Sequence, residues 1–338
     1  MLRKTMVIAG AALAAGAGLW RTQAHADAEA VRSDPQAPLL DDLDVPGEQR
    51  WVTSTDGTRL NVELHGPEGA PVVVFAHGWT CSTRYWIPQV RALADTYRVV
   101  TYDQRGHGAS GSSRGRFTPE LLAADLEAVL ENVLAPEEQA VLVGHSMGAM
   151  SIVAWAGQQP DQVSRRVRRV LLASTALDSL LTETAVVRLP SRFPRLAEAI
   201  GRGAVGIPTP FGPPSPLAYR AVKYVALSPS ASPAQVAFCE EIVLSSRTRD
   251  RAKWGSALAR LDLRESLTHL TVPTTVLVGT ADRLTPPSHA KRLAEALKRD
   301  GHLDLLVQLP GVGHMSSVEN VDAFNAEVRR LLEAEPAG

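Results

Sequence analysis

The chain has 338 residues, of which 45% are hydrophobic and 21% charged, and its formal net charge is −1. This length and composition describe a globular protein with one main domain and an insertion. Because Lys and Arg do not outnumber Asp and Glu, the chain has no excess positive charge to neutralise a phosphate backbone, and we expect no nucleic-acid partner. The densest basic run, Arg165–Arg169, is interpreted as a solvated helix end.

Residues 1–26 have the pattern of an export segment. Arg3 and Lys4 precede the apolar stretch Met6–Trp20, and Ala24-His25-Ala26 is a small-x-small cleavage pattern. As a helix this stretch spans about 22 Å, less than the ~30 Å of a hydrocarbon core. It therefore favours a cleaved signal peptide over a retained membrane anchor, and a buried N-terminal helix is a further alternative. We expect an exported or membrane-anchored protein, associated with the membrane only through this segment.

Residues 27–47 contain several Pro and Asp residues and are expected to form an extended tether. From residue 48 onward, short β-branched and apolar runs indicate eight strands, the first two joined by the hairpin signal Asp56-Gly57. The expected strands are Arg50–Thr55, Leu60–His65, Pro71–Ala76, Arg98–Tyr102, Ala140–Gly144, Val170–Thr175, Thr274–Gly279 and Asp304–Leu309. The helix-period segments between them are Tyr85–Tyr97, Pro119–Leu134, Met147–Gln158, Ser288–Arg299 and Val321–Leu332.

The alternation of strands and helices predicts an α/β fold with a doubly wound, mostly parallel eight-stranded sheet. Residues 176–270 break the rhythm with clustered Pro and Gly among short helical pieces, and we interpret them as an inserted helical cap. The core would then consist of residues 48–175 and 271–334. A packing subdomain without a part in substrate choice is the alternative for the insertion.

Gly144-His145-Ser146-Met147-Gly148 matches G-x-S-x-G directly after an expected strand and at the start of an expected helix. The glycines permit a sharp turn that exposes the serine, so Ser146 is the candidate nucleophile. His77-Gly78-Trp79 closes another buried strand. We expect the amides of Trp79 and Met147 to form an oxyanion hole, and His77 to fix the loop.

A serine hydroxyl needs a base within hydrogen-bond reach. His314 follows the last expected strand in a Gly-flanked loop and is the candidate base. Asp282 ends another strand and is the candidate acid that orients the imidazole. Asp178, which follows the preceding strand, is its rival. The other histidines lack comparable settings.

These residues resemble the α/β-hydrolase superfamily, and the resemblance extends from about Arg50 to Leu332, insertion included. Asp103–Ser110 looks like that family's D-x-R-G-x-G-x-S loop, which we interpret as structural. One departure is Ala149, where many members have a further Gly; it bears on helix packing and leaves the chemistry unaltered. Ser146 occupies the position at which haloalkane dehalogenases and epoxide hydrolases carry Asp, which argues against alkyl-enzyme chemistry.

The resemblance implies cleavage of an ester, thioester or amide through an acyl-enzyme, without a metal or organic cofactor. Esterase- or lipase-like action on a small or medium acyl ester is the form that we expect. A perhydrolase or haloperoxidase, a carbon-carbon bond hydrolase, or a non-catalytic binding protein of the same fold are the alternatives. Cys81 and Cys239 lack metal-ligand spacing, and a single bridge between them is left open. Aromatic residues that could line the pocket or simply pack are Trp79, Tyr85, Trp86, Phe211, Tyr219 and Tyr224.

Overall fold

The computed structural model describes residues 20–184 and 206–335. Its centre is an eight-stranded sheet with the strand order β1-β2-β4-β3-β5-β6-β7-β8, in which β1 and β2 run antiparallel to their neighbours and the other strands are parallel. The strands are β1 (Gly47–Thr53), β2 (Arg59–His65), β3 (Val72–Ala76), β4 (Arg98–Tyr102), β5 (Ala140–His145), β6 (Val167–Ala173), β7 (Thr274–Gly279) and β8 (Leu303–Leu309). The expected fold class is confirmed.

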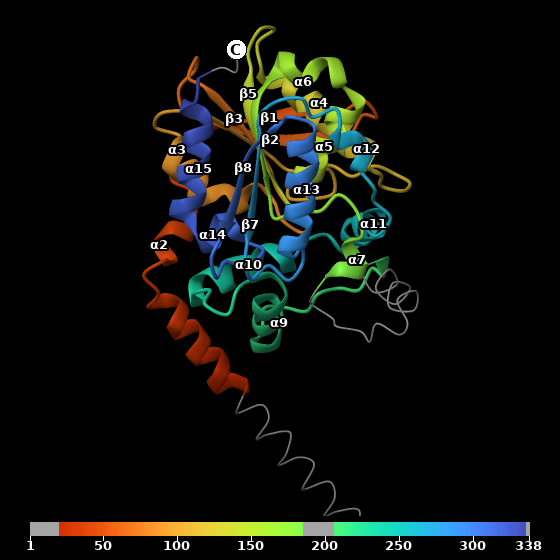
Figure 1. Cartoon of the computed structure of the whole chain (residues 1–338). Coiled ribbons are helices and arrows are strands. Elements are labelled where there is room, and N and C mark those ends of the chain that lie inside the picture. Colours follow the sequence, from red (N-terminus) through yellow and green to blue (C-terminus); the bar gives the residue numbers. More distant parts are fainter. Residues whose placement is uncertain (1–19, 185–205, 336–338) are drawn as a thin grey trace, which may run out of the picture.

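Every residue of β3, β5 and β7 is buried, because helices cover both faces of the parallel part of the sheet. In Figure 1, α3 and α15 lie on one side and α4, α5 and α13 on the other. The helices of these layers are η1 (Thr83–Trp86), α3 (Ile87–Leu93), α4 (Pro119–Val133), α5 (Met147–Gln158), α6 (Pro160–Arg166), α13 (Pro287–Arg299), α14 (Ser316–Glu319) and α15 (Val321–Glu333).

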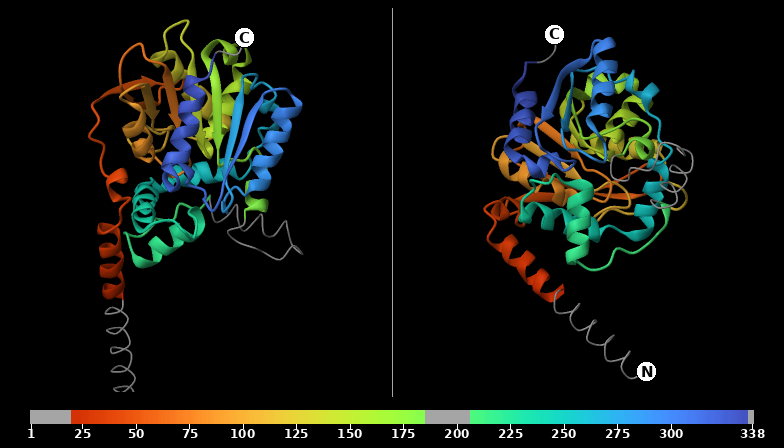
Figure 2. Two further views of the ribbon diagram at one scale, coloured as in Figure 1. Left: turned by 60° about the vertical axis from the view of Figure 1, so that its left-hand side comes forward. Right: turned by 60° about the horizontal axis from the view of Figure 1, so that its bottom comes forward.

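The insertion follows the carboxyl end of β6, the edge from which the loops after β5, β7 and β8 also depart. The described helices that gather at this end of the molecule (Figure 1 and Figure 2) are α7 (Leu180–Glu183), α9 (Pro216–Ala226), α10 (Pro233–Ser245) and α11 (Thr248–Leu258). The last one, α12 (Arg264–Leu267), packs against α5 instead. The part of the expected cap at 185–205 lies outside the described residues.

The segment before the core differs from the expected extended tether. Residues 20–32 are helical, and α2 (Ala37–Leu40) follows. Asp27 pairs with Arg220 of α9 at 2.9 Å, and the Asp34 carboxylate accepts a hydrogen bond from the Ala234 amide of α10 at 2.7 Å. The Ala- and Glu-containing stretch before Pro35 has high helix propensity, which outweighed the turn-forming residues that follow.

Residues 1–19, which include most of the expected export segment, lie outside the described residues. Among the described helices, none is both long and apolar enough to cross a membrane.

The basic run Arg165–Arg169 differs in part from its interpretation as a helix end. α6 ends at Arg166, but β6 begins at Val167, so that Arg168 and Arg169 belong to a strand. Arg168 donates to main-chain carbonyls at the end of α15, and Arg169 donates to the Glu335 carbonyl at 3.0 Å. Pairing with carbonyls of the C-terminal segment allows two charged side chains to stand in the strand.

Candidate active site

Ser146 occupies a strained turn between β5 and α5. Its φ of 52° and ψ of −114° lie outside the regions that non-glycine residues prefer, a kind of strain that clusters at functional sites. A Cβ at Gly148 would lie 1.9 Å from the Ala76 carbonyl oxygen, so only glycine lets α5 approach β3 this closely. The chain therefore folds sharply at the serine.

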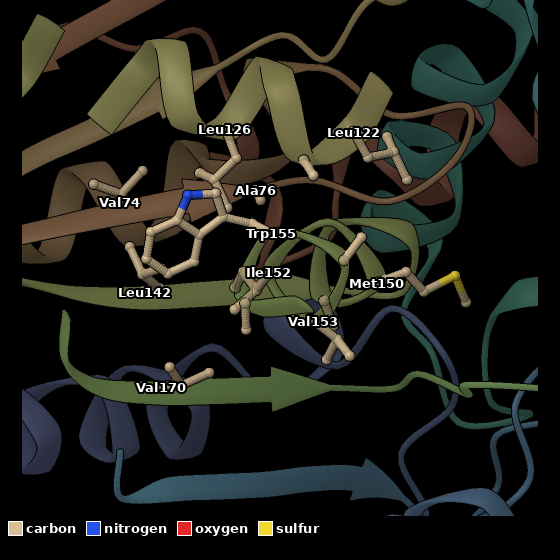
Figure 3. Close-up of a cluster of buried hydrophobic side chains, with 14 of the residues drawn as sticks. Val74, Ala76, Leu122, Leu126, Leu142, Met150, Ile152, Val153, Trp155 and Val170 are labelled. Atoms are coloured by element: carbon tan, nitrogen blue, oxygen red, sulfur yellow. The ribbon is translucent and has the colours of Figure 1, made fainter. Parts of the chain in front are cut away.

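Buried contacts hold α5 in place behind this turn. Trp155 of α5 is fully buried among side chains from the sheet and from α4, including Leu142 and Leu126 (Figure 3). Ala149, the residue after the G-x-S-x-G motif, is also fully buried. A Cβ at Gly144 would lie 2.5 Å from the Ala149 backbone, so it is Gly144, and not the residue at position 149, that must lack a side chain.

Asp282 and His314 meet at the carboxyl edge of the sheet. The Nδ1 atom of His314 lies 2.9 Å from Oδ2 of Asp282, and both side chains are buried. Thr285 donates its hydroxyl to the same carboxylate oxygen at 2.8 Å, and the amides of Leu284 and Thr285 donate to the other oxygen at 2.9 Å. Four donors therefore fix the carboxylate, and one of them is the Nδ1 proton of the imidazole.

The rival acid, Asp178, faces other partners. It pairs with Arg264 at 3.3 Å and with Arg292 at 3.6 Å, and its side chain is partly exposed. The structure thus brings Asp282 to His314 and leaves Asp178 in an ion-pair cluster at the base of the insertion.

The side chain of His145, next to Ser146, contacts the main chain of the loop that carries His314. Its Nε2 lies 2.9 Å from the His314 carbonyl oxygen, and the two rings are 4.9 Å apart. A carbonyl only accepts, so Nε2 carries the proton. Burial lowers the pKa of His145 well below its usual value, and the neighbouring His314 lowers it further. His145 is therefore a neutral brace that joins the serine turn to the His314 loop.

The turn after β3 lies against Ser146. A Cβ at Gly78 would come within 3.2 Å of the Ser146 Cβ. Thr80 has a positive φ of 67°, and the indole of Trp79 donates to the Arg251 carbonyl of α11 at 3.1 Å. Among the described residues, the main-chain amides of Trp79 and Met147 donate no hydrogen bond. Both amides are thus available to a ligand at this turn.

The loop Asp103–Ser110 braces that turn. His77 donates from Nδ1 to the Gly78 carbonyl at 2.8 Å and accepts the Gln104 amide at Nε2 at 3.1 Å. His107 accepts the Thr80 amide at 3.2 Å. Burial lowers the pKa of both histidines, so each is neutral and each accepts at Nε2.

Two candidate pocket aromatics, Tyr85 and Trp86, are completely buried in the core, whereas Phe211 and Tyr224 are exposed on the insertion. Within residues 20–184 and 206–335, no cluster of three or more His, Cys, Asp or Glu side chains could hold a metal ion.

The sequence did not indicate Thr285 and Glu319, both of which contact the site. Their position shortly after Asp282 and His314 was the only available signal.

Comparison with known proteins agrees with this architecture. The chain belongs to the alpha/beta hydrolase family, whose model matches residues 73–327. It is 27% identical to a non-heme chloroperoxidase of Burkholderia pyrrocinia, over 84% of this chain and 99% of that protein. It is 26% identical to a bifunctional esterase/perhydrolase of Acinetobacter calcoaceticus, over 84% and 99%. The crystal structure of an enol-lactonase from Burkholderia xenovorans matches with a TM-score of 0.65 and 25% identity, over 84% and 100%.

Proposed function

We propose that this protein is a serine hydrolase that cleaves a carboxylic ester through an acyl-enzyme. Ser146 would be the nucleophile, His314 the general base and Asp282 the acid that orients it. The observation that carries the proposal is the buried 2.9 Å contact between His314 Nδ1 and Asp282 Oδ2. It commits the Nδ1 proton to the carboxylate, and Nε2 is left as the atom that can accept a proton from a serine hydroxyl.

In the proposed reaction, the Ser146 Oγ attacks the ester carbonyl carbon while His314 Nε2 takes the hydroxyl proton. The carbonyl oxygen becomes an oxyanion, which the main-chain amides of Trp79 and Met147 would bind; one such donor is typically worth about 3 to 4 kcal/mol of transition-state stabilisation. His314 then gives the proton to the departing alcohol oxygen. Water, activated by the same imidazole, releases the acid and regenerates the serine.

The neutral state of the surrounding histidines supports this division of roles. Both His145 and His77 use their single ring proton in a hydrogen bond to a carbonyl oxygen. His77 cannot take up a proton at Nε2 without losing the Gln104 amide. The Nδ1 of His145 has no partner among the described residues, but burial lowers the pKa of this imidazole well below its usual value, which makes it a poor base. The proposal therefore assigns the proton transfer to His314 alone.

The test is covalent labelling and turnover. Wild-type protein should react with a fluorophosphonate probe and hydrolyse short p-nitrophenyl esters, and Ser146→Ala should lose both. Ser146→Ala, His314→Ala and the double variant should lose similar amounts of activity, because triad members act as a unit. Folded wild-type protein that neither labels nor turns over would instead favour a non-catalytic binding protein.

A second candidate activity is peracid formation from a carboxylic acid and hydrogen peroxide. It is favoured by the similarity to proteins named as a chloroperoxidase and an esterase/perhydrolase. In this reaction peroxide would take the place of water in attacking the acyl-enzyme. Ester hydrolysis and peracetic acid formation from acetate and peroxide should be measured on the same preparation; peracid without ester cleavage would reverse our preference.

A further inference from the structure

The loop that carries His314 is attached to the insertion as well as to the sheet. The His314 amide donates a hydrogen bond of 3.0 Å to the carbonyl of Ala226, which is the last residue of α9. Glu319, at the end of α14, lies at the same junction. Its Oε2 accepts the Gly313 amide at 3.0 Å and the Ser228 amide at 2.8 Å. One carboxylate oxygen thus joins the residue before the base to the segment after α9.

The two segments are in direct contact at this point. A Cβ at Gly313 would lie 2.5 Å from the Ser228 nitrogen and 2.7 Å from the Leu227 carbonyl carbon. Gln235 of α10 also donates its side-chain amide to the Val318 carbonyl at 2.9 Å. Thus α9 contacts His314 itself, and α10 contacts the chain that follows it. The position of the loop that carries His314, which we call the base loop, therefore depends on the insertion.

The second oxygen of Glu319 faces the interior. Its Oε1 is buried and has no hydrogen-bond partner among the described residues. The ring of Tyr85 packs 4.7 Å from that of His145. Burial raises the pKa of Tyr85 well above its usual value, with a smaller contribution from the Glu319 carboxylate. Glu319 therefore lies within electrostatic range of Tyr85, whose ring packs on that of His145.

We infer that Glu319 is a positioning residue that clamps the His314 loop to residues 226–228 of the insertion. This inference rests on the proposed function, in which His314 is the base. A carboxylate oxygen that accepts two amides from separate segments holds their spacing. Without it, the amides of Gly313 and Ser228, both in buried residues, would lose their acceptor, and the base loop could separate from α9.

The activity test compares three substitutions at Glu319. Glu319→Ala removes the shared acceptor and should lower kcat about tenfold or more, with less than about a threefold change in KM, because the substrate contacts would be intact. Glu319→Gln retains an amide oxygen and should keep most of the activity. Glu319→Asp is too short to reach both amides and should fall between the two. It also preserves the comparison if the Ala variant does not fold.

The control is Glu241→Ala, since Glu241 joins α10 to Arg84 through an exposed ion pair of 2.6 Å without touching the base loop. It should leave kcat unchanged. Wild-type kcat in Glu319→Ala, or equal losses in the Ala and Gln variants, would overturn the inference.

Hydrogen exchange gives a readout that does not require activity. Peptides covering 226–228 and 313–319 should exchange faster in Glu319→Ala than in wild type, and both should be unaffected in Glu241→Ala. Unchanged exchange in both peptides would overturn the clamp even if the wild type proved inactive. An inactive wild type with faster exchange in Glu319→Ala would contradict the proposed function and support the clamp.

Discussion

Thr285 belongs to the environment of the Asp282 carboxylate although no motif includes it. Its hydroxyl donates to Oδ2, the same oxygen that His314 approaches. We expect Thr285→Val to lower kcat about tenfold, the cost of one hydrogen bond to a charged group, because the carboxylate keeps its other donors but loses the hydroxyl on the oxygen that faces His314. KM for a p-nitrophenyl ester should change little. Steady-state kinetics on the purified variant measures both.

The matched control for this prediction is Thr268→Val, since the Thr268 hydroxyl only donates to the Glu265 carbonyl at an exposed helix end. It should have wild-type kinetics. If Thr285→Val also keeps its full kcat, the hydroxyl has no part in orienting the carboxylate.

A site residue could be predicted from the sequence where it directly follows a predicted strand. Asp282 and His314 could be placed together because each follows a parallel strand, and such strands end at one edge of the sheet. Thr285 and Glu319 could not be predicted, because their roles depend on where their side chains point: the Thr285 hydroxyl turns back to Asp282, and the Glu319 carboxylate reaches the Gly313 and Ser228 amides. Ser228, which donates to Glu319, comes from an insertion whose path the sequence does not indicate.

At the scale of elements, the loop after β4 is joined to α4 by a buried ion pair. The Arg105 side chain is fully buried, and its Nε donates to Asp125 of α4 at 2.6 Å while a second nitrogen contacts the other carboxylate oxygen. Breaking a buried pair from one side typically costs about 3 to 5 kcal/mol. We therefore expect Asp125→Ala to lower the free energy of unfolding by about this amount, measured by urea denaturation.

An exposed pair provides the comparison. Asp262→Ala removes one of the two carboxylate partners of Arg264, the one at 2.6 Å, where both side chains are largely exposed. It should change the free energy of unfolding by less than about 1 kcal/mol. A cost for Asp125→Ala no larger than that for Asp262→Ala would mean that the second ion pair of Arg105, with Asp56 at 2.7 Å, is enough to compensate its buried charge.

The strands were easier to predict than the segments outside the sheet. Runs such as those of β3 and β7 are apolar along their whole length because both faces are buried, and this leaves a clear pattern. The start of β6 was missed because Arg168 and Arg169 interrupt that pattern. The helix over residues 27–32 was missed because the Pro and Asp content of residues 27–47 predicts an extended segment. The ion pair of Asp27 with the insertion, which also holds this helix, is not visible in the sequence.

At the scale of the whole molecule, the insertion and the sheet share one hydrophobic cluster. Cys81, in the loop after β3, and Cys239, in α10, both belong to it, and both are free and buried. A cluster that includes α10 and β3 side chains predicts that the insertion does not open by itself. The insertion and the core should then unfold as a single cooperative unit.

The reactivity of the two thiols can show whether the insertion and the core unfold together. Burial raises the pKa of Cys81 to about 12 and that of Cys239 well above its usual value, so neither forms the reactive thiolate in the folded protein at pH 8. In Cys81→Ala and Cys239→Ala, the remaining thiol should react with Ellman's reagent only on unfolding, and the two should show the same urea dependence. If Cys239 reacts at lower urea than Cys81, the insertion opens before the core and the shared cluster does not couple them.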